Sequence, residues 1–182
     1  NDGTILKYTE DLPPLEHLML PDDEALPWIK DTYTKKQAND VYRFKVSLGF
    51  DSPVWRVIEI SAGQTFADLD VAIRDAFGHD RYDHMGGFWK LIPRGKSQKK
   101  FREIEIGDIN PLEEGTAADL HIGGMDLKPG DLMKYVYNFG DWVEHEVRFE
   151  EITTVETEKS YPALVGRNKP KHQYCVVCES KG

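Results

Sequence analysis

The segment from Tyr135 to Glu150, with the sequence YVYNFGDWVEHEVRFE, constrains the fold more than any other part of the chain. Apolar and polar side chains alternate on both sides of the Gly140-Asp141 pair, and a period of two is typical of β-strands. Glycine in the first position of a two-residue loop favours a type II′ turn. We therefore predict a β-hairpin. One face of its second strand carries Val143, His145, Val147 and Phe149.

The same period of two indicates three more strands, over residues 41–50, 54–61 and 101–106, and an apolar run predicts another over residues 87–93, between the last two of these. Between the second and third of these strands, residues 65–77 change to a helical period. Thr65 followed by Asp68 predicts a capping box, and Gly78 is placed to end the helix. On this spacing Arg74 lies away from the apolar stripe of the helix. The predicted fold is α+β, a mostly antiparallel sheet with one main crossing helix in the manner of a β-grasp.

Residues 1–40 differ in composition from the rest of the chain, because four prolines interrupt short apolar groups there. Proline at this density disfavours both helices and sheets. We expect an irregular N-terminal arm or linker over residues 1–40. Residues 41–182 are expected to form a single domain, with a cysteine-containing tail from about residue 168.

Charge and composition exclude some classes of function. The formal net charge of −9 disfavours broad binding to a phosphate backbone, which requires a basic surface. No apolar run approaches the roughly 20 residues of a membrane helix, so we expect no membrane partner. The chain has only 2 cysteines, which favours a reducing, cytoplasmic location.

Polar and aromatic side chains at the predicted hairpin tip are candidates for binding a protein or a small ligand. The candidate residues are His84, Tyr137, Asn138, Asp141, Trp142 and His145. His145 has two interpretations: a hydrogen-bonded core residue, or a general base that needs a partner to orient it. Asp141, Tyr137 or His84 could supply that partner. Asn138 and Asp141 would alternatively satisfy the backbone of the turn.

The tail contains a second candidate site, because His172, Cys175 and Cys178 are each separated by two residues. A Cys-x-x-Cys knuckle is half of a structural zinc site, since tetrahedral coordination needs four ligands. Zinc is therefore the cofactor that this motif would bind. A redox dithiol or two unligated thiols are the alternatives.

The hairpin segment resembles the signature of the plasmid pRiA4b ORF-3-like family, which includes passenger proteins of insertion elements. The signature residues present are Tyr135, Tyr137, Phe139, Gly140, Asp141, Trp142, His145 and Glu150. Asn138 replaces the usual aspartate, and one residue is missing before Trp142. Shorter similarities occur at residues 53–56, 65–78, 84–88 and 161–166, so the resemblance covers residues 41–167. It implies an α+β fold and no established activity.

Three functional hypotheses follow. The first is a non-catalytic binding or regulatory module that uses the surface around residues 79–88 and 138–145. The second is a metal-assisted hydrolase or nuclease, in which the metal ligands would be His84, Asp141, Glu144 and His145. The third is a nucleic-acid-associated protein linked to mobile elements, acting through the basic loop at residues 94–100 and the basic tail.

Overall fold

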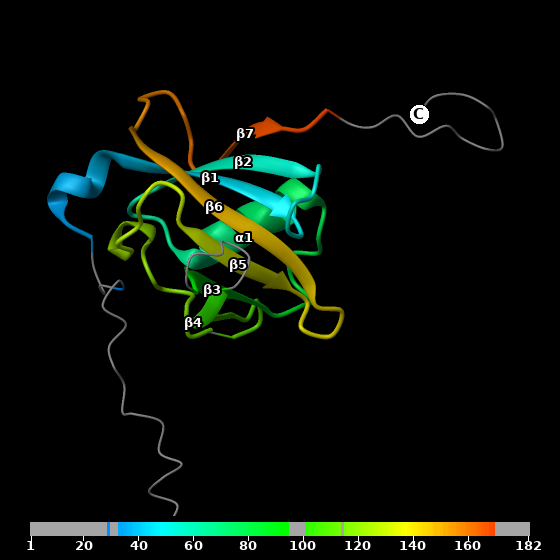
Figure 1. Ribbon diagram of the computed structural model, residues 1–182. Helices are drawn as coiled ribbons and strands as arrows, with labels where there is room; N and C mark the ends of the chain where they lie inside the picture. Colours follow the sequence, from blue (N-terminus) through cyan, green and yellow to red (C-terminus); the bar gives the residue numbers. More distant parts are fainter. Residues whose placement is uncertain (1–28, 30–32, 95–100, 114, 170–182) are drawn as a thin grey trace, which may run out of the picture.

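The computed structural model describes residue 29 and residues 33–94, 101–113 and 115–169 (Figure 1). Seven strands form one sheet in the order β4-β3-β5-β6-β1-β2-β7, and every pair of neighbours is antiparallel. The strands are β1 (Asp40–Leu48), β2 (Trp55–Ser61), β3 (Gly86–Pro93), β4 (Phe101–Ile109), β5 (Leu132–Tyr137), β6 (Val143–Thr154) and β7 (Ala163–Arg167). Two short 3-10 helices complete the described elements, η2 (Lys35–Asn39) and η3 (Ile122–Gly124).

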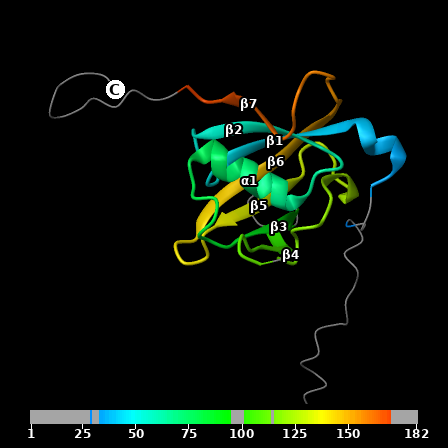
Figure 2. The ribbon, with the colours of Figure 1, turned by 180° about the vertical axis from the view of Figure 1, so that it is seen from behind.

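Helix α1 (Phe66–Phe77) lies across one face of this sheet, as Figure 2 shows from behind. The predicted capping box is present, because the Thr65 amide donates to Asp68 Oδ2 at 2.9 Å and the Asp68 amide donates to Thr65 Oγ1. Gly78 ends the helix in the left-handed conformation, with φ of 74°. The α+β prediction of one helix on a mostly antiparallel sheet is confirmed. Strand β7 is an element that the sequence pattern did not predict.

The core lies between α1 and the sheet. The helix contributes Phe66, Leu69 and Ile73, which are all fully buried. Every strand from β1 to β6 supplies apolar side chains to the same cluster, among them Phe44, Ile58, Phe88, Ile106, Tyr135 and Phe149. None of the helices in the described part of the chain is long and apolar enough to span a membrane.

The predicted two-residue turn at Gly140-Asp141 is wrong. Tyr137 and Val143 are the last paired residues of the hairpin, so the loop contains five residues, 138–142. Asn138 and Trp142 occupy the left-handed region, with φ of 55° and 54°, and the Trp142 amide donates to the Asn138 carbonyl at 2.7 Å. Asparagine tolerates this conformation because its short side chain bonds locally to the backbone, so the reversal does not depend on Gly140. The predicted faces of β6 are nevertheless correct.

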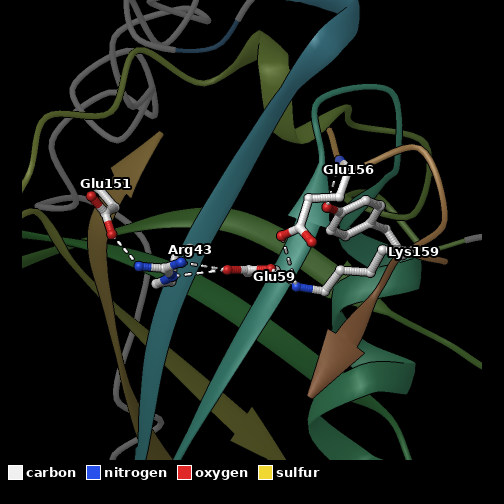
Figure 3. A network of polar contacts seen from close by, with 6 residues as sticks. Arg43, Glu59, Glu151, Glu156 and Lys159 are labelled. Carbon is white, nitrogen blue, oxygen red and sulfur yellow. Dashed lines mark hydrogen bonds and ion pairs between the residues drawn. The ribbon is translucent and has the colours of Figure 1, made fainter. Parts of the chain in front are cut away.

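A buried carboxylate fixes the segment between β6 and β7 to the sheet (Figure 3). Glu59 is 3 % exposed and accepts from Arg43 Nη2 at 2.6 Å and from Lys159 Nζ at 2.5 Å. Arg43 also pairs with Glu151 on the neighbouring strand. Burial alone would raise the pKa of Glu59, but the hydrogen bonds from Lys159 and Arg43 outweigh burial and hold that pKa below its usual value.

Candidate functional site

Three loops meet at one end of the sheet, and we call this surface the loop end. They are residues 49–54 between β1 and β2, residues 78–85 between α1 and β3, and residues 138–142 between β5 and β6. The Gly49 amide donates to the Glu144 carbonyl at 2.8 Å, and the Asn138 amide donates to the Met85 carbonyl at 2.9 Å. Backbone hydrogen bonds therefore join the first and second loops to the hairpin.

Beneath the loop end, the structure brings together three of the predicted site residues. His145 is fully buried, and its Nε2 atom lies 3.1 Å from Nε2 of His79. The ring of His79 stacks on Tyr137 with centroids 4.3 Å apart, and the ring of His84 meets Tyr137 edge-on at 5.5 Å. His145, Tyr137 and His84 thus belong to one ring cluster. His79, which was not among the predicted ligand-binding residues, connects His145 to Tyr137.

The two contacting histidines are held in their neutral forms. Burial and, to a smaller extent, the neighbouring His79 together lower the pKa of His145 to about 4. Burial also lowers the pKa of His79, and the positive charge of Arg74 adds to this effect. At neutral pH one imidazole must therefore donate a hydrogen bond to the other, which makes the pair a fixed structural contact.

A buried ion pair lies next to these rings. Arg74 Nε is 2.7 Å from Asp70 Oδ2, one helical turn away, and the Tyr135 hydroxyl donates to Asp70 Oδ1 at 2.7 Å. The Arg74 guanidinium also covers the Tyr137 ring at 5.0 Å. The prediction that Arg74 lies away from the apolar stripe is wrong, because its side chain is fully buried. The i, i+4 spacing of two opposite charges is the sequence signal that could have indicated this pair.

The remaining predicted residues lie apart from His145. Asn138 Nδ2 donates to Asp141 Oδ2 at 2.8 Å, and the Gly140 amide donates to Asn138 Oδ1 at 3.0 Å, so both side chains stabilise the loop. Glu144 immediately precedes His145, so it lies on the other face of β6, where it accepts from Trp142 Nε1 at 3.0 Å. Among the described residues, no group of three or more histidines, cysteines and carboxylates could hold a metal ion.

An aromatic cluster occupies the face of the sheet that α1 leaves uncovered. Trp89, Phe139 and Trp142 form it, with ring centroids 5.9 to 6.2 Å apart. The ammonium of Lys134 lies 5.0 Å from the Trp89 ring and 5.7 Å from the Trp142 ring. Lys134 is 5 % exposed and pairs with Glu103. The cluster therefore surrounds a cation of the chain itself.

Gly87 lies directly beneath this aromatic cluster. A Cβ atom on Gly87 would lie 2.9 Å from Cη2 of Trp89 and 3.0 Å from Cζ of Phe139. The 2.9 Å contact is shorter than Cβ atoms make in folded proteins, so a larger residue would displace the rings. The small residue at position 87 thus lets the rings lie directly on the strand.

The loop end exposes large apolar side chains. Of the ten such residues that are exposed in the described chain, five lie here or at its edge: Leu48, Phe50, Tyr82, Met85 and Trp142. Tyr82 and Trp142 are the most exposed of the five, at 70 % and 48 %. Grouped exposure of this kind marks interaction surfaces more often than isolated exposed residues do.

The loop end also carries carboxylates. The three loops carry Asp51, Asp80, Asp83 and Asp141. Arg81 is the single lysine or arginine among their residues, and it is paired with Asp75 of α1. The loop end is therefore negatively charged, because the positive charge of Arg81 is balanced by Asp75.

The other sequence-predicted features lie outside the described residues. These are the three tail residues His172, Cys175 and Cys178, most of the basic loop (residues 95–100) and most of the predicted N-terminal arm (residues 1–28 and 30–32). The zinc prediction therefore stays a prediction.

Fold and site together define a class of α+β domains, in which one helix crosses an antiparallel sheet and the β5–β6 hairpin supplies the candidate surface. The chain belongs to the plasmid pRiA4b ORF-3-like protein family, whose family model matches residues 40–173. This confirms the resemblance seen in the hairpin sequence. No curated protein sequence matches the chain significantly.

The chain is also similar to a solved structure, the crystal structure of protein of unknown function MM3350 from Methanosarcina mazei Go1. The two chains share 23 % sequence identity, with a TM-score of 0.48. The similarity covers 75 % of this chain and 70 % of the other.

Proposed function

We propose that this protein is a non-catalytic binding module that recognises a protein partner through the loop end. The observation that carries the proposal is the gathering of exposed Tyr82, Met85 and Trp142 from two loops that are hydrogen-bonded to each other. Tyrosine, tryptophan and methionine are enriched at the centres of protein interfaces. A partner that contacts both loops would bury all three side chains.

The chemistry beneath the loops supports binding more than catalysis. A general base must reach a substrate proton, yet His145 is fully buried and its Nε2 atom faces His79. With its pKa lowered to about 4, His145 is neutral at physiological pH and packs against Phe77 at a centroid distance of 4.9 Å. These contacts hold the 78–85 loop against the hairpin and so make the binding surface rigid.

The hydrolase hypothesis lacks comparable support. It requires His84, Asp141, Glu144 and His145 to surround one ion, whereas His145 and Glu144 lie on opposite faces of β6. Asp141 is engaged by Asn138 in the loop. The acidic loops likewise disfavour nucleic acid at this surface, because a phosphate backbone would be repelled.

Two finer expectations accompany the proposal. We infer a reducing, cytoplasmic setting, since the chain has only 2 cysteines. We also infer that His172, Cys175 and Cys178 supply up to three of the four ligands of a zinc site. Metal analysis of the intact protein, beside a Cys175→Ser variant, tests the zinc site, and an equal metal content of the two proteins would contradict it.

The test of the binding function begins with a photocrosslinking amino acid in place of Tyr82 and, as a control, in place of Leu112. Leu112 is 80 % exposed but lies outside the three loops. We expect a discrete crosslinked partner from position 82 and none from position 112. The purified partner should then lose affinity for a Trp142→Ala variant and keep its affinity for Leu112→Ala.

Two results would contradict this function. The first is a partner whose affinity is the same for Trp142→Ala and for the unmodified protein. The second is enzymatic turnover by the purified protein that disappears in a folded His145→Ala variant.

A further inference from the structure

We propose that the loop end recognises a basic peptide segment, and that an arginine side chain of this segment stacks on the exposed ring face of Trp142. This inference rests on the proposed function and specifies the chemistry of the partner. It follows from the position of Trp142, from the charges around it and from the cation that its ring cluster already holds.

Trp142 is a rigid and accessible ring. Its indole Nε1 donates to Glu144 Oε1 at 3.0 Å, and its ring packs against Phe139 with centroids 5.9 Å apart. The residue is nevertheless 48 % exposed. A ring that is already fixed loses little conformational entropy on binding, and a planar guanidinium stacks well on an indole face.

The charges of the loop end select the sign of the ligand. Asp51 and Asp83 are exposed, and Asp141 is exposed immediately before Trp142. Arg81 is already paired with Asp75, so the loops offer a cationic partner carboxylates without a competing free cation of their own. An acidic partner would instead meet like charge, which lowers both affinity and association rate.

The aromatic cluster already binds a cation of the protein itself, the ammonium of Lys134. Lys134 lies over both Trp89 and Trp142 and pairs with Glu103, so an aromatic and acidic environment surrounds a nearly buried ammonium. The same pairing of ring and carboxylate recurs at the surface, where Glu144 lies beside the exposed part of Trp142. A partner's cation would extend an arrangement that is already present.

The neighbouring apolar side chains indicate what accompanies the arginine. Phe50, Tyr82 and Met85 are exposed on the adjoining loops and would contact apolar residues of the same segment. A segment that alternates arginine with large apolar residues satisfies both features. A purely polar cationic ligand would leave these three side chains uncovered.

The experiment uses ¹⁵N-labelled full chain and four peptides of equal length, in which leucine alternates with arginine, lysine, serine or glutamate. Backbone amide and indole N–H signals are followed during each titration. We expect the arginine peptide to shift the Trp142 indole signal and the amides of the three loops, and the lysine peptide to do so more weakly. We expect the glutamate peptide to shift none of them.

Variants separate stacking from charge. Trp142→Ala should weaken binding of the arginine peptide roughly tenfold, the range expected for a cation–π contact, while Trp142→Phe keeps part of the affinity. Leu112→Ala is the exposed control and should leave the affinity unchanged. A combined Asp51→Asn and Asp83→Asn variant should weaken binding and reduce its dependence on salt.

Each other outcome overturns the inference. The inference is overturned if the arginine peptide does not bind or if the glutamate peptide binds equally well. It is also overturned if Trp142→Ala binds the arginine peptide with unchanged affinity. Equal binding of the serine peptide at the loop end would overturn the cationic specificity but leave the proposed function standing. Shifts confined to surfaces away from the three loops would contradict both.

Discussion

The Nε2 atoms of His79 and His145 lie 3.1 Å apart, and this contact joins the loop after α1 to the beginning of strand β6. Only one proton can lie between the two nitrogens, so the accepting ring must be neutral and the contact is lost when both rings are protonated. Arg74 adds a positive charge near His79, and Phe77 and Tyr135 surround His145 with aromatic rings. The ring cluster is therefore sensitive to acid.

Stability should fall as the pH falls from about 6.5 to about 4. The unfolded chain binds a proton at His145 below its ordinary pKa near 6.5, whereas the folded state resists protonation until about pH 4. Between these values the unfolded state carries the extra proton, so the free energy of unfolding decreases by roughly 3 kcal/mol. Above pH 6.5 this histidine contributes no pH dependence. Urea unfolding at a series of pH values measures the change.

A His145→Leu variant tests whether His145 causes the loss of stability at low pH. Its unfolding free energy should change less between pH 6.5 and pH 4 than that of the unmodified protein, because the titrating group is gone. His84→Ala is the control, because His84 is only partly buried and, unlike His79, has no ring nitrogen placed to hydrogen-bond with His145 in the described structure. An unaltered slope in His145→Leu would show that other groups cause the acid sensitivity.

The Asp70–Arg74 pair should behave as a coupled unit. Asp70→Leu leaves a buried guanidinium without its carboxylate and should cost about 3 to 5 kcal/mol of stability. The double variant Asp70→Leu with Arg74→Met removes both charges and should recover most of that loss. Denaturant unfolding of the two singles and the double completes the cycle. Additive losses in the double variant would mean that the two side chains are not energetically coupled.

Local sequence patterns predict most of the strands and the helix. The features that they do not predict depend on contacts between residues that are far apart in the sequence. Alternation placed His145 in the core because Val143, Val147 and Phe149 surround it at a period of two. Burial of Arg74 depends instead on Asp70 and on Tyr135, whose hydroxyl reaches Asp70 from 65 positions away. No local pattern contains such a contact.

The loop and the ring cluster illustrate the same limit. A glycine-based turn rule misassigned the hairpin, because Asn138 takes the left-handed conformation. His79 was missed as a site residue because its role depends on the approach of the α1–β3 loop to β6. Contacts between distant elements thus separate the predicted site from the observed one.

Gly86→Ala should be strongly destabilising. The added Cβ would lie 2.9 Å from Asp70 Oδ1 and 3.1 Å from the Tyr135 hydroxyl, and both groups are buried and hydrogen-bonded to each other. Neither can move without breaking that bond, so we expect a loss of about 1 to 3 kcal/mol. Gly140→Ala is the matched control, because its Cβ meets only Asn138 Oδ1 at 3.2 Å. Equal effects of the two substitutions would refute this account.

Gly87→Ala should change the surface more than the stability. The atoms that its Cβ would meet are the outer ring atoms of Trp89 and Phe139, which can rotate away. We expect a stability loss below about 1.5 kcal/mol, together with shifted indole signals of Trp89 and Trp142. Arginine-peptide affinity should fall with the displaced rings. Unshifted indole signals would show that the cluster tolerates the methyl group.

The place of β1 in the sheet has a consequence for synthesis on the ribosome. β1 pairs with β2 on one side and with β6 on the other, in a register that runs from Asp40 opposite Thr154 to Leu48 opposite His145. In a nascent chain, the β1 edge of an early β1–β2 hairpin therefore stays open until residue 154 has left the exit tunnel. Pairings this distant in sequence form slowly, and an unpaired edge is prone to aggregate.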